Sequence, residues 1–328
     1  MKTLALKIPQ IKRLWDDRLS LISERDSLTA KLVAANSENS PFYHYVSSFD
    51  AIEVMKRHAR KALLPAPNHR TNFLGVKISP KSFPGILDGT EGSVEPVPIP
   101  ANWHADIAEW AAALRAVDLA KGTFRVIELG CGWGCWLLNT GAAARHAGLK
   151  VDLIGIEGDG EHVKLAHQSM ADNGFKENDY RIIHGIAAGQ KGKALFPVVD
   201  NAGAKWGSEP IFNASTKQVE DAAETGSHDI LDTYPISELS DGKIVDLLHI
   251  DIQGGETDFV ESCLGEINRY VRYIVIGTHS RAIEGKLMEI MLAAGWRLEM
   301  ERAAIIRIDG GSPQITVDGV QGWRNPTL

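Results

Sequence analysis

The sequence lacks several features that would place it in a specialised class of protein. Only three cysteines occur among 328 residues, which is too few for a disulfide framework and favours a reducing compartment. Lys and Arg total 35 against 42 Asp and Glu, a net charge of −7, so we expect no nucleic-acid partner. No apolar run reaches 18 residues and no signal peptide is apparent. We therefore expect a cytoplasmic protein without a transmembrane segment.

The remaining composition is that of an ordinary soluble enzyme. Hydrophobic residues make up 44% of the chain and charged residues 23%, both close to the average of globular domains. The length allows one large domain or two modest ones, with ample core.

A glycine-rich turn between a predicted strand and a predicted helix is the most informative feature. Residues 124–138 read FRVIELGCGWGCWLL, an apolar run followed by Gly130, Gly132 and Gly134 and then by apolar residues at helical spacing. Glycine lets the backbone turn sharply beneath a ligand and approach it closely. The following helix directs its first amide groups at the same place. This order predicts a βαβ nucleotide-binding unit.

The acid before the first glycine bears on which nucleotide is bound. A dinucleotide fingerprint reads G-x-G-x-x-G, and Cys135 occupies its third glycine position here. Glu128 would repel a pyrophosphate but suits a ligand with an ammonium group, such as S-adenosylmethionine (SAM). The pattern E-x-G-x-G-x-G resembles the first motif of class I SAM-dependent methyltransferases. On this turn alone, an NAD(P)-dependent Rossmann enzyme stays open.

Acidic and basic residues end the predicted strands. Beyond the glycine turn, strands are predicted at 151–157, 181–185, 244–252 and 270–278, with helices between them. In an open α/β sheet, ligands bind at the carboxyl ends of the strands. Glu128, Glu157, Asp251 and His279 all fall at that edge. We predict a Rossmann-like, doubly wound α/β sheet, closed by an antiparallel pair at 297–308 and 314–320.

Two of these strand ends predict further contacts with the cofactor. Glu157 follows Gly134 by 23 residues, close to the spacing at which an acid meets ribose hydroxyl groups. The segment from His184 to Ala187 is expected beside the adenine. The predicted cofactor-binding residues are Glu128, Gly130, Cys131, Gly132, Gly134, Glu157, Gly158, His184, Gly185, Ile186 and Asp251.

Three later segments make the family resemblance more specific. DLLHIDIQGGE (Asp246–Glu256) resembles the D-L-[IL]-K-I-D-[VI]-E-G-[AS]-E motif of FkbM-type methyltransferases. IVIGTHS (Ile274–Ser280) resembles the strand of that family that ends in histidine, and DGVQGWRNP (Asp318–Pro326) resembles its closing segment. The resemblance covers about residues 123–328. It implies a seven-stranded class I methyltransferase sheet that methylates hydroxyl groups, often on sugars or glycosylated natural products.

The sequence departs from that motif at two positions. His249 stands where lysine is usual, and Gln253 replaces the glutamate after Asp251. The second change weakens the case for Mg²⁺, which some sugar O-methyltransferases hold with clustered carboxylates, so we predict no metal. Cys131 and Cys135 are expected to be packing residues rather than metal or redox ligands.

A hydroxyl group is a poor nucleophile at neutral pH, so a base beside it would help methyl transfer. His279 is the first choice for that base, because an unperturbed histidine titrates near neutrality. Asp251 is the second choice, as base, as orienter of the histidine or as holder of the cofactor's ammonium group. A strand-end Asp that only caps the next helix is the structural alternative.

The first 120 residues lie outside the resemblance. Leu14, Leu21 and Leu28 recur every seven residues within 8–34, which predicts either a self-associating helix or an amphipathic helix packed on its own domain. A helix is expected from Ser48 to about Leu64, and another from Asn102 to about Ala120. Between them, residues 65–101 are rich in proline and long enough to form a lid.

We therefore divide the chain into a helical segment at 1–40, accessory helices and lid at 41–120, and a methyltransferase domain at 121–328. Residues 189–235 are predicted to be an insertion beside the acceptor, where Trp206 suits stacking on a sugar although core packing is the more ordinary role. Before the glycine turn, His104 or Trp110 could contact the ligand, although ordinary packing is the expected role of both. A catalytically silent SAM-binding scaffold acting through its N-terminal helix stays open.

Overall fold

A computed structural model describes residues 40–198 and 207–328 of the chain. The chain divides after His44, and residues 45–328 form one unit. Ahead of that point lies a short 3-10 helix, η1 (Pro41–Tyr43), whose N-cap is Ser40. The predicted helix at 8–34 and Trp206 lie outside the described residues.

The main sheet has eight strands in the order β1-β13-β16-β12-β11-β4-β5-β6. The strands are β1 (Val46–Ser47), β4 (Thr123–Leu129), β5 (Lys150–Glu157), β6 (Tyr180–His184), β11 (Leu247–Ile250), β12 (Tyr273–Thr278), β13 (Arg297–Arg302) and β16 (Gly319–Arg324). Strands β12, β11, β4, β5 and β6 pair in parallel, whereas β16 is antiparallel to both of its neighbours. The predicted seven-stranded α/β sheet is confirmed, with the short β1 added at one edge.

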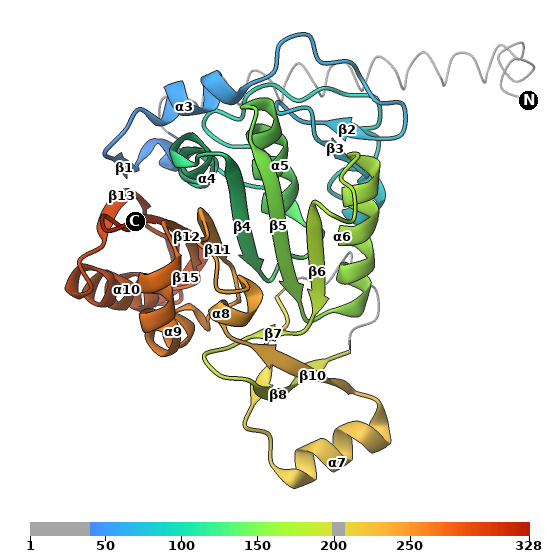
Figure 1. Cartoon of the computed structure of the whole chain (residues 1–328), viewed down its shortest axis with the longest axis vertical. Coiled ribbons are helices and arrows are strands. Elements are labelled where there is room, and N and C mark those ends of the chain that lie inside the picture. The colour runs from blue at the N-terminus through green and yellow to red at the C-terminus, as the bar shows by residue number, and fades with distance from the viewer. Residues whose placement is uncertain (1–39, 199–206) are drawn as a thin grey trace, which may run out of the picture. The chain divides into compact units, whose positions relative to one another are not determined.

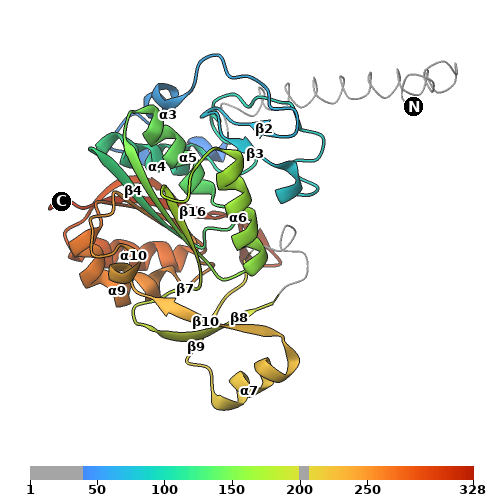
Figure 2. The same ribbon diagram turned by 45° about the vertical axis from the view of Figure 1, so that its right-hand side comes forward.

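Helices cover both faces of this sheet (Figures 1 and 2). One face packs against α4 (Ile107–Leu119), α5 (Cys135–His146) and α6 (Gly160–Asp172), and the other against α8 (Ile236–Leu239), α9 (Glu256–Tyr270) and α10 (Arg281–Ala293). Successive strand residues point to opposite faces. Phe124 and Val126 of β4 accordingly join the first core, while Ile127 and Leu129 join the second. The doubly wound arrangement follows from this two-sided burial.

The chain order reverses between β4 and β11. It runs from β4 outward through β5 to β6, then returns to the other side of β4 with β11 and continues to β12. Ligands bind at such a switch point, outside the carboxyl ends of the strands. Glu128 and His249 are register partners across it, so their side chains share the face that carries α4 and α5.

The predicted insertion forms a small sheet of its own. Its order is β7-β10-β8-β9, from β7 (Ile186–Ala187), β10 (His228–Tyr234), β8 (Gly192–Pro197) and β9 (Ile211–Phe212). Helix α7 (Thr216–Thr225) precedes β10 and begins with a capping box at Ser215. Figure 1 places this layer at the carboxyl ends of β4, β5 and β6. The segment is therefore regular, although its polar sequence gave no such signal.

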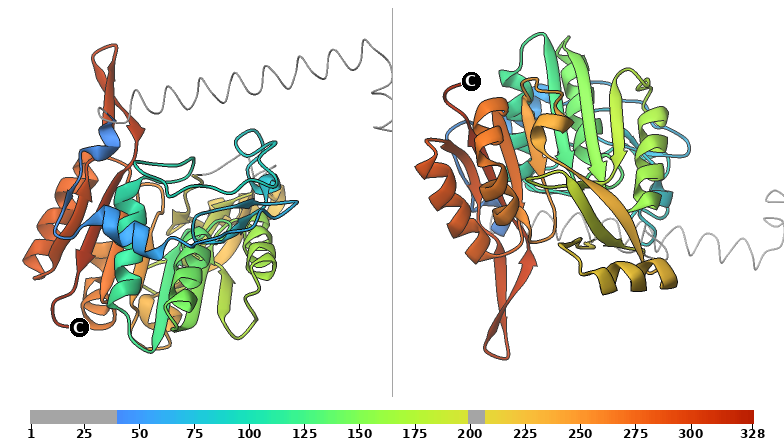
Figure 3. Two further views of the ribbon diagram at one scale, coloured as in Figure 1. Left: turned by 90° about the horizontal axis from the view of Figure 1, so that it is seen from above. Right: turned by 60° about the horizontal axis from the view of Figure 1, so that its bottom comes forward.

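The closing pair differs from the prediction. Strand β13 pairs with β16, and the residues between them form a separate hairpin of β14 (Ile305–Asp309) and β15 (Ser312–Val317). The hairpin projects away from the main sheet (Figure 3). The expected strands at 297–308 and 314–320 were wrong, because each joined parts of two strands that belong to different sheets.

The segment before β4 packs on the first face. It contains α3 (Ala51–His58), β2 (Arg70–Thr71), β3 (Lys77–Ile78) and the 3-10 helix η2 (Pro80–Ser82). Helix α3 has Asp50 as its N-cap, two residues after the expected start at Ser48, and it ends well before Leu64. Helix α4 begins at Ile107 rather than Asn102, because Asp106 accepts the amide hydrogen bonds of its first turn. Within the described ranges, no helix has the length and apolar character needed to cross a membrane.

Candidate functional site

A cavity of about 820 Å³ lies at the switch point. Its wall is built from the ends of β4, β5 and β11, the glycine turn, the start of α9, the accessory segment and the insertion. Parts of the chain far apart in sequence therefore meet at one edge of the sheet.

The glycine turn brings the backbones of two strand ends into close approach. Gly130 has a φ of +71°, and a Cβ there would lie 2.3 Å from the carbonyl oxygen of Asp251. Only glycine fits that position, because both the conformation and the space exclude a side chain. Gly134, with a φ of +81°, is the N-cap of α5 and faces Met170 and Ala166 of α6. The first glycine thus shapes the ligand edge, and the last packs two helices.

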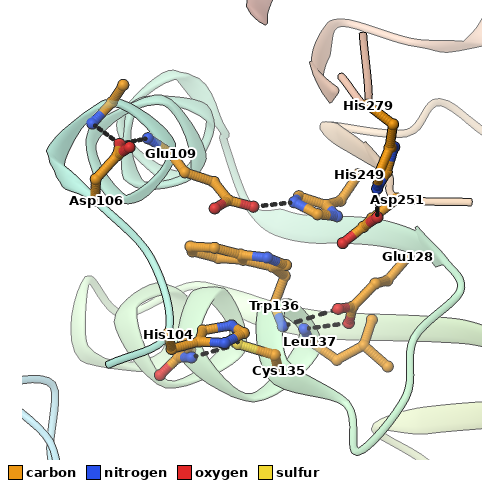
Figure 4. Close-up of polar contacts among 12 residues, drawn as sticks. His104, Asp106, Glu109, Glu128, Cys135, Trp136, Leu137, His249, Asp251 and His279 are labelled. Carbon is orange, nitrogen blue, oxygen red and sulfur yellow. Dashed lines mark hydrogen bonds and ion pairs between the residues drawn. The ribbon is translucent and has the colours of Figure 1, made fainter. Parts of the chain in front are cut away.

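Glu128 holds the start of helix α5 against strand β4 (Figure 4). The amide nitrogens of Trp136 and Leu137 donate to its two carboxylate oxygens at 3.1 and 2.9 Å. The side chain is only 3% exposed, and burial raises its pKa to about 7 despite these hydrogen bonds. Glu128 lines the cavity, so it both caps the helix and places an acidic group beside the ligand edge.

Glu157, at the end of β5, likewise accepts backbone hydrogen bonds and lines the cavity. Its two oxygens accept hydrogen bonds from the amides of Gly132, at 2.7 Å, and Asp159, at 2.8 Å. Asp159 in turn caps helix α6 by accepting from the amides of Glu161 and His162. Both acids line the cavity. Glu157, the acid expected to contact the ribose, therefore also anchors the glycine turn through its hydrogen bond with the Gly132 amide.

Asp251 lines the cavity and pairs with His279, which lies behind it. Nε2 of His279 lies 3.3 Å from Oδ1 of Asp251, and its Nδ1 lies 2.9 Å from Oε1 of Glu256. Burial alone would lower the pKa of His279, but the two carboxylates outweigh it and raise that pKa to about 10. Enclosure would raise the pKa of Asp251, but the His279 partner holds it below its usual value. At neutral pH the pair is an imidazolium and a carboxylate.

Gln253 supports the same carboxylate. Its Nε2 donates to Oδ1 of Asp251 at 3.3 Å, from a backbone with a φ of +58°. A glutamate in this place would put two negative charges side by side. The departure from the family motif therefore replaces repulsion with a hydrogen bond.

A buried histidine links the sheet edge to α4. Nε2 of His249 lies 3.1 Å from Oε1 of Glu109, and its ring stacks on Trp136 with centroids 5.2 Å apart. Burial would lower the pKa of His249, but Glu109 outweighs it and raises that pKa. Its Nδ1 is buried and has no hydrogen-bond partner among the described residues. His249 thus places an imidazole of raised pKa beside Glu128 and Asp251, where the FkbM-type motif has lysine.

A second histidine contacts the glycine turn from the accessory segment. Nε2 of His104 lies 2.6 Å from Sγ of Cys135, and Cys135 also accepts from Asn139. Burial lowers the pKa of His104 to about 4, so the ring is neutral at pH 7. Burial raises the pKa values of the Cys131 and Cys135 thiols, which keeps both protonated.

The structure brings most of the predicted cofactor-binding residues to one wall. Those that line the cavity are Glu128, Gly130, Cys131, Gly132, Glu157, Gly158, Gly185, Ile186 and Asp251. Gly134 and His184 lie off this wall, since Gly134 packs against α6 and His184 bonds the carbonyl oxygen of Gly158 at 3.0 Å. His279 also lies behind it, shielded by Asp251.

Sequence analysis missed several wall residues. Phe83, Trp103, Trp133, Phe196 and Phe212 line the cavity, and so does His104, for which packing was the expected role. Trp110 is buried against Phe73 and Trp136 as predicted. The proline-rich composition around Phe83 was the only signal for that segment, and nothing local marked the individual rings.

No protein-family model matches the chain. A relative from Jannaschia sp. (strain CCS1), named "Putative methyltransferase", is 50% identical over 263 residues, which are 80% of this chain and 94% of the relative. The chain belongs to the family of this methyltransferase.

Two solved structures resemble this methyltransferase more distantly. Methyltransferase FkbM from Methylobacillus flagellatus KT has 12% identity and a TM-score of 0.41, with 66% of this chain and 54% of that chain covered. Precorrin-6y C5,15-methyltransferase from Geobacter metallireducens GS-15 has 10% identity and a TM-score of 0.36, with 66% and 87% covered. The sequence identities and TM-scores of both structures are low. The class I methyltransferase fold is evident from the strand order and the helices on both faces.

Proposed function

We propose that this methyltransferase uses SAM as its methyl donor and methylates a hydroxyl group of a sugar, glycan or glycosylated natural product. The observation that carries the donor assignment is the glycine turn between two carboxylates. Glu157 holds the glycine turn by the Gly132 amide, Glu128 holds the first turn of α5 by the Trp136 and Leu137 amides, and both acids line the cavity. Their negative charge suits a cationic ligand and opposes a pyrophosphate, so SAM fits and NAD(P) does not.

The acceptor assignment is supported by Asp251 at the cavity wall. SAM supplies a methyl group on a sulfonium sulfur. In an in-line displacement, the bond from the acceptor oxygen to the methyl carbon forms as the sulfur–carbon bond breaks, and that electron pair stays on sulfur. The hydroxyl proton must leave at the same time. Asp251, whose side chain is 45% exposed, accepts that proton.

His279 has a different part from the one first predicted. An imidazolium cannot accept a proton, so His279 acts as a fixed charge that positions Asp251. Asp251 is a weak base in this pair, but the acceptor oxygen becomes strongly acidic as it is alkylated, so a weak base is sufficient. Asp251 is thus the proposed base, and His279, the first choice in the sequence analysis, is the residue that positions it.

We also propose that the chain is FkbM-type. The closing segment at 318–326 is consistent with that assignment, because Gln321 and Trp323 are fully buried and hydrogen-bonded to each other at 3.0 Å. We further propose that residues 121–328 carry the donor site and that the segments 65–101 and 189–235 frame the acceptor. The N-terminal segment at 1–40, pairing through 8–34, a cytoplasmic location and a silent scaffold role remain predictions.

Calorimetric titration with S-adenosylhomocysteine tests the donor site. We expect micromolar binding, no binding of NAD, and loss of binding in Glu157→Ala. Glu161→Ala is the matched control, because Glu161 lies close in the chain but is 61% exposed. Binding of NAD instead would refute the proposal. Mass spectrometry of a glycan and glycoside panel incubated with SAM then tests hydroxyl methylation, and methylation of none, despite tight binding, would favour the scaffold.

A further inference from the structure

An aromatic cluster forms one end of the cavity. Its rings are Phe83, Trp103, Trp133 and His104, which come from the accessory segment and the glycine turn. Phe83 lies 4.7 Å from Trp103 and 5.5 Å from Trp133 between ring centroids, and His104 lies 6.0 Å from Trp133. Nothing in the donor site requires so many rings, because the glycine turn and the two acids already account for it.

The charge of the wall is one-sided. Among the described residues, the lining acids are Glu128, Glu157, Asp159, Glu209, Asp251 and Asp258, and the lining residues include no Lys or Arg. His249 also lines the cavity and lies 3.1 Å from Glu109. An anionic ligand would meet an excess of acidic side chains in an enclosed space, where repulsion is strong.

The aromatic cluster adjoins the proposed base. Asp251 and His249 lie close enough to His104 to influence its pKa, and Trp136 stacks on His249. Figure 4 shows the Trp136 ring between His104 and His249, with Asp251 beside His249. Because the cluster and Asp251 line the same cavity, we expect a ring held by the cluster to direct a hydroxyl group towards Asp251.

We infer that Phe83, Trp103 and Trp133 form the acceptor subsite and that it selects an uncharged glycoside with an apolar aglycone. The inference rests on the proposed function, because it names the substrate class of the same site. Aromatic faces stack on apolar ring surfaces, and the acidic wall repels carboxylate and phosphate groups.

Two probes that differ in one group test the inference. Phenyl β-D-glucoside and phenyl β-D-glucuronide are titrated into the full-length protein, with and without S-adenosylhomocysteine, and tryptophan fluorescence is followed. We expect the glucoside to quench fluorescence saturably and the glucuronide to bind at least about tenfold more weakly, a difference of about 1.4 kcal/mol. Equal binding of the two, tighter binding of the glucuronide or no binding of the glucoside would overturn the inference.

Variants then locate the site. Trp103→Ala removes the indole ring, and Phe83→Leu removes the phenyl ring at similar side-chain volume. Each substitution is expected to weaken glucoside binding about fivefold to tenfold. Binding of S-adenosylhomocysteine should be unchanged in both, which also shows that they fold. Unchanged glucoside affinity in both variants would contradict the subsite. Failure of the wild type to bind S-adenosylhomocysteine would instead refute the proposed function. The subsite would still be tested in that case, because the glucoside and the glucuronide are also titrated in the absence of S-adenosylhomocysteine.

Discussion

Nδ1 of His279 lies 2.9 Å from Oε1 of Glu256, a side chain with no solvent exposure, while Nε2 of the same ring lies 3.3 Å from Asp251. A neutral imidazole carries one N–H, so it cannot donate to both carboxylates at once. The arrangement is that of an imidazolium. Four predictions follow from this relationship and its surroundings.

His279 should stay protonated well above neutral pH. Its pKa is raised from 6.5 to about 10, so its stabilising effect is complete below about pH 6.5 and is lost as pH rises through about 10. Nitrogen-15 NMR of the ring should show two protonated nitrogens at pH 8. His279→Asn should lower the free energy of unfolding by about 2 kcal/mol at pH 6, and less at pH 10. A ring that titrates near pH 6.5 would contradict the prediction.

Gly130→Ala should destabilise the protein far more than an alanine at another left-handed glycine. The new Cβ would lie 2.3 Å from the Asp251 carbonyl oxygen, so the switch point would have to open. Gly122→Ala is a matched control, with a φ of +72° and no atom within 4 Å. Gly122→Ala should lower the free energy of unfolding by about 1–2 kcal/mol. Thermal unfolding compares the two, and equal losses would show that the close approach is not restrictive.

Gln253→Glu should raise the pKa of Asp251. The substitution exchanges an amide donor 3.3 Å from Oδ1 of Asp251 for a second carboxylate, which disfavours ionisation of the pair. The acidic limb of the activity–pH profile should move up by about one pH unit. Gln253→Met controls for loss of the amide without added charge and should shift the limb less. An unmoved profile in both variants would remove Asp251 from the proton transfer.

Methyl transfer should survive removal of divalent metal. Asp251, Glu256 and His279 each present a possible ligand atom within 4.8 Å of the others. A metal-bound histidine must first give up a proton, and a pKa of about 10 opposes that loss. Dialysis against EDTA should leave the rate of S-adenosylhomocysteine formation unchanged. A loss that Mg²⁺ restores would show that the cluster is a metal site.

The sequence by itself determined the sheet and its ligand edge. Strand periodicity and the glycine turn that begins at Gly130 are local properties, because they depend on residues adjacent in the chain. Parallel strands must place their carboxyl ends at one edge. For that reason Glu128, Glu157 and Asp251 were placed correctly before any coordinates were considered, and nine predicted cofactor residues share one wall.

Only the tertiary structure decided what the polar residues do there. Glu256 neutralises the far side of His279, and no local pattern shows that these two groups meet. Phe83 and Trp103 reach the cavity through an irregular segment without periodicity, and the insertion gains strands only by pairing with distant residues. Protonation states and pocket walls depend on neighbours across space, whereas strands and glycine turns depend on neighbours along the chain.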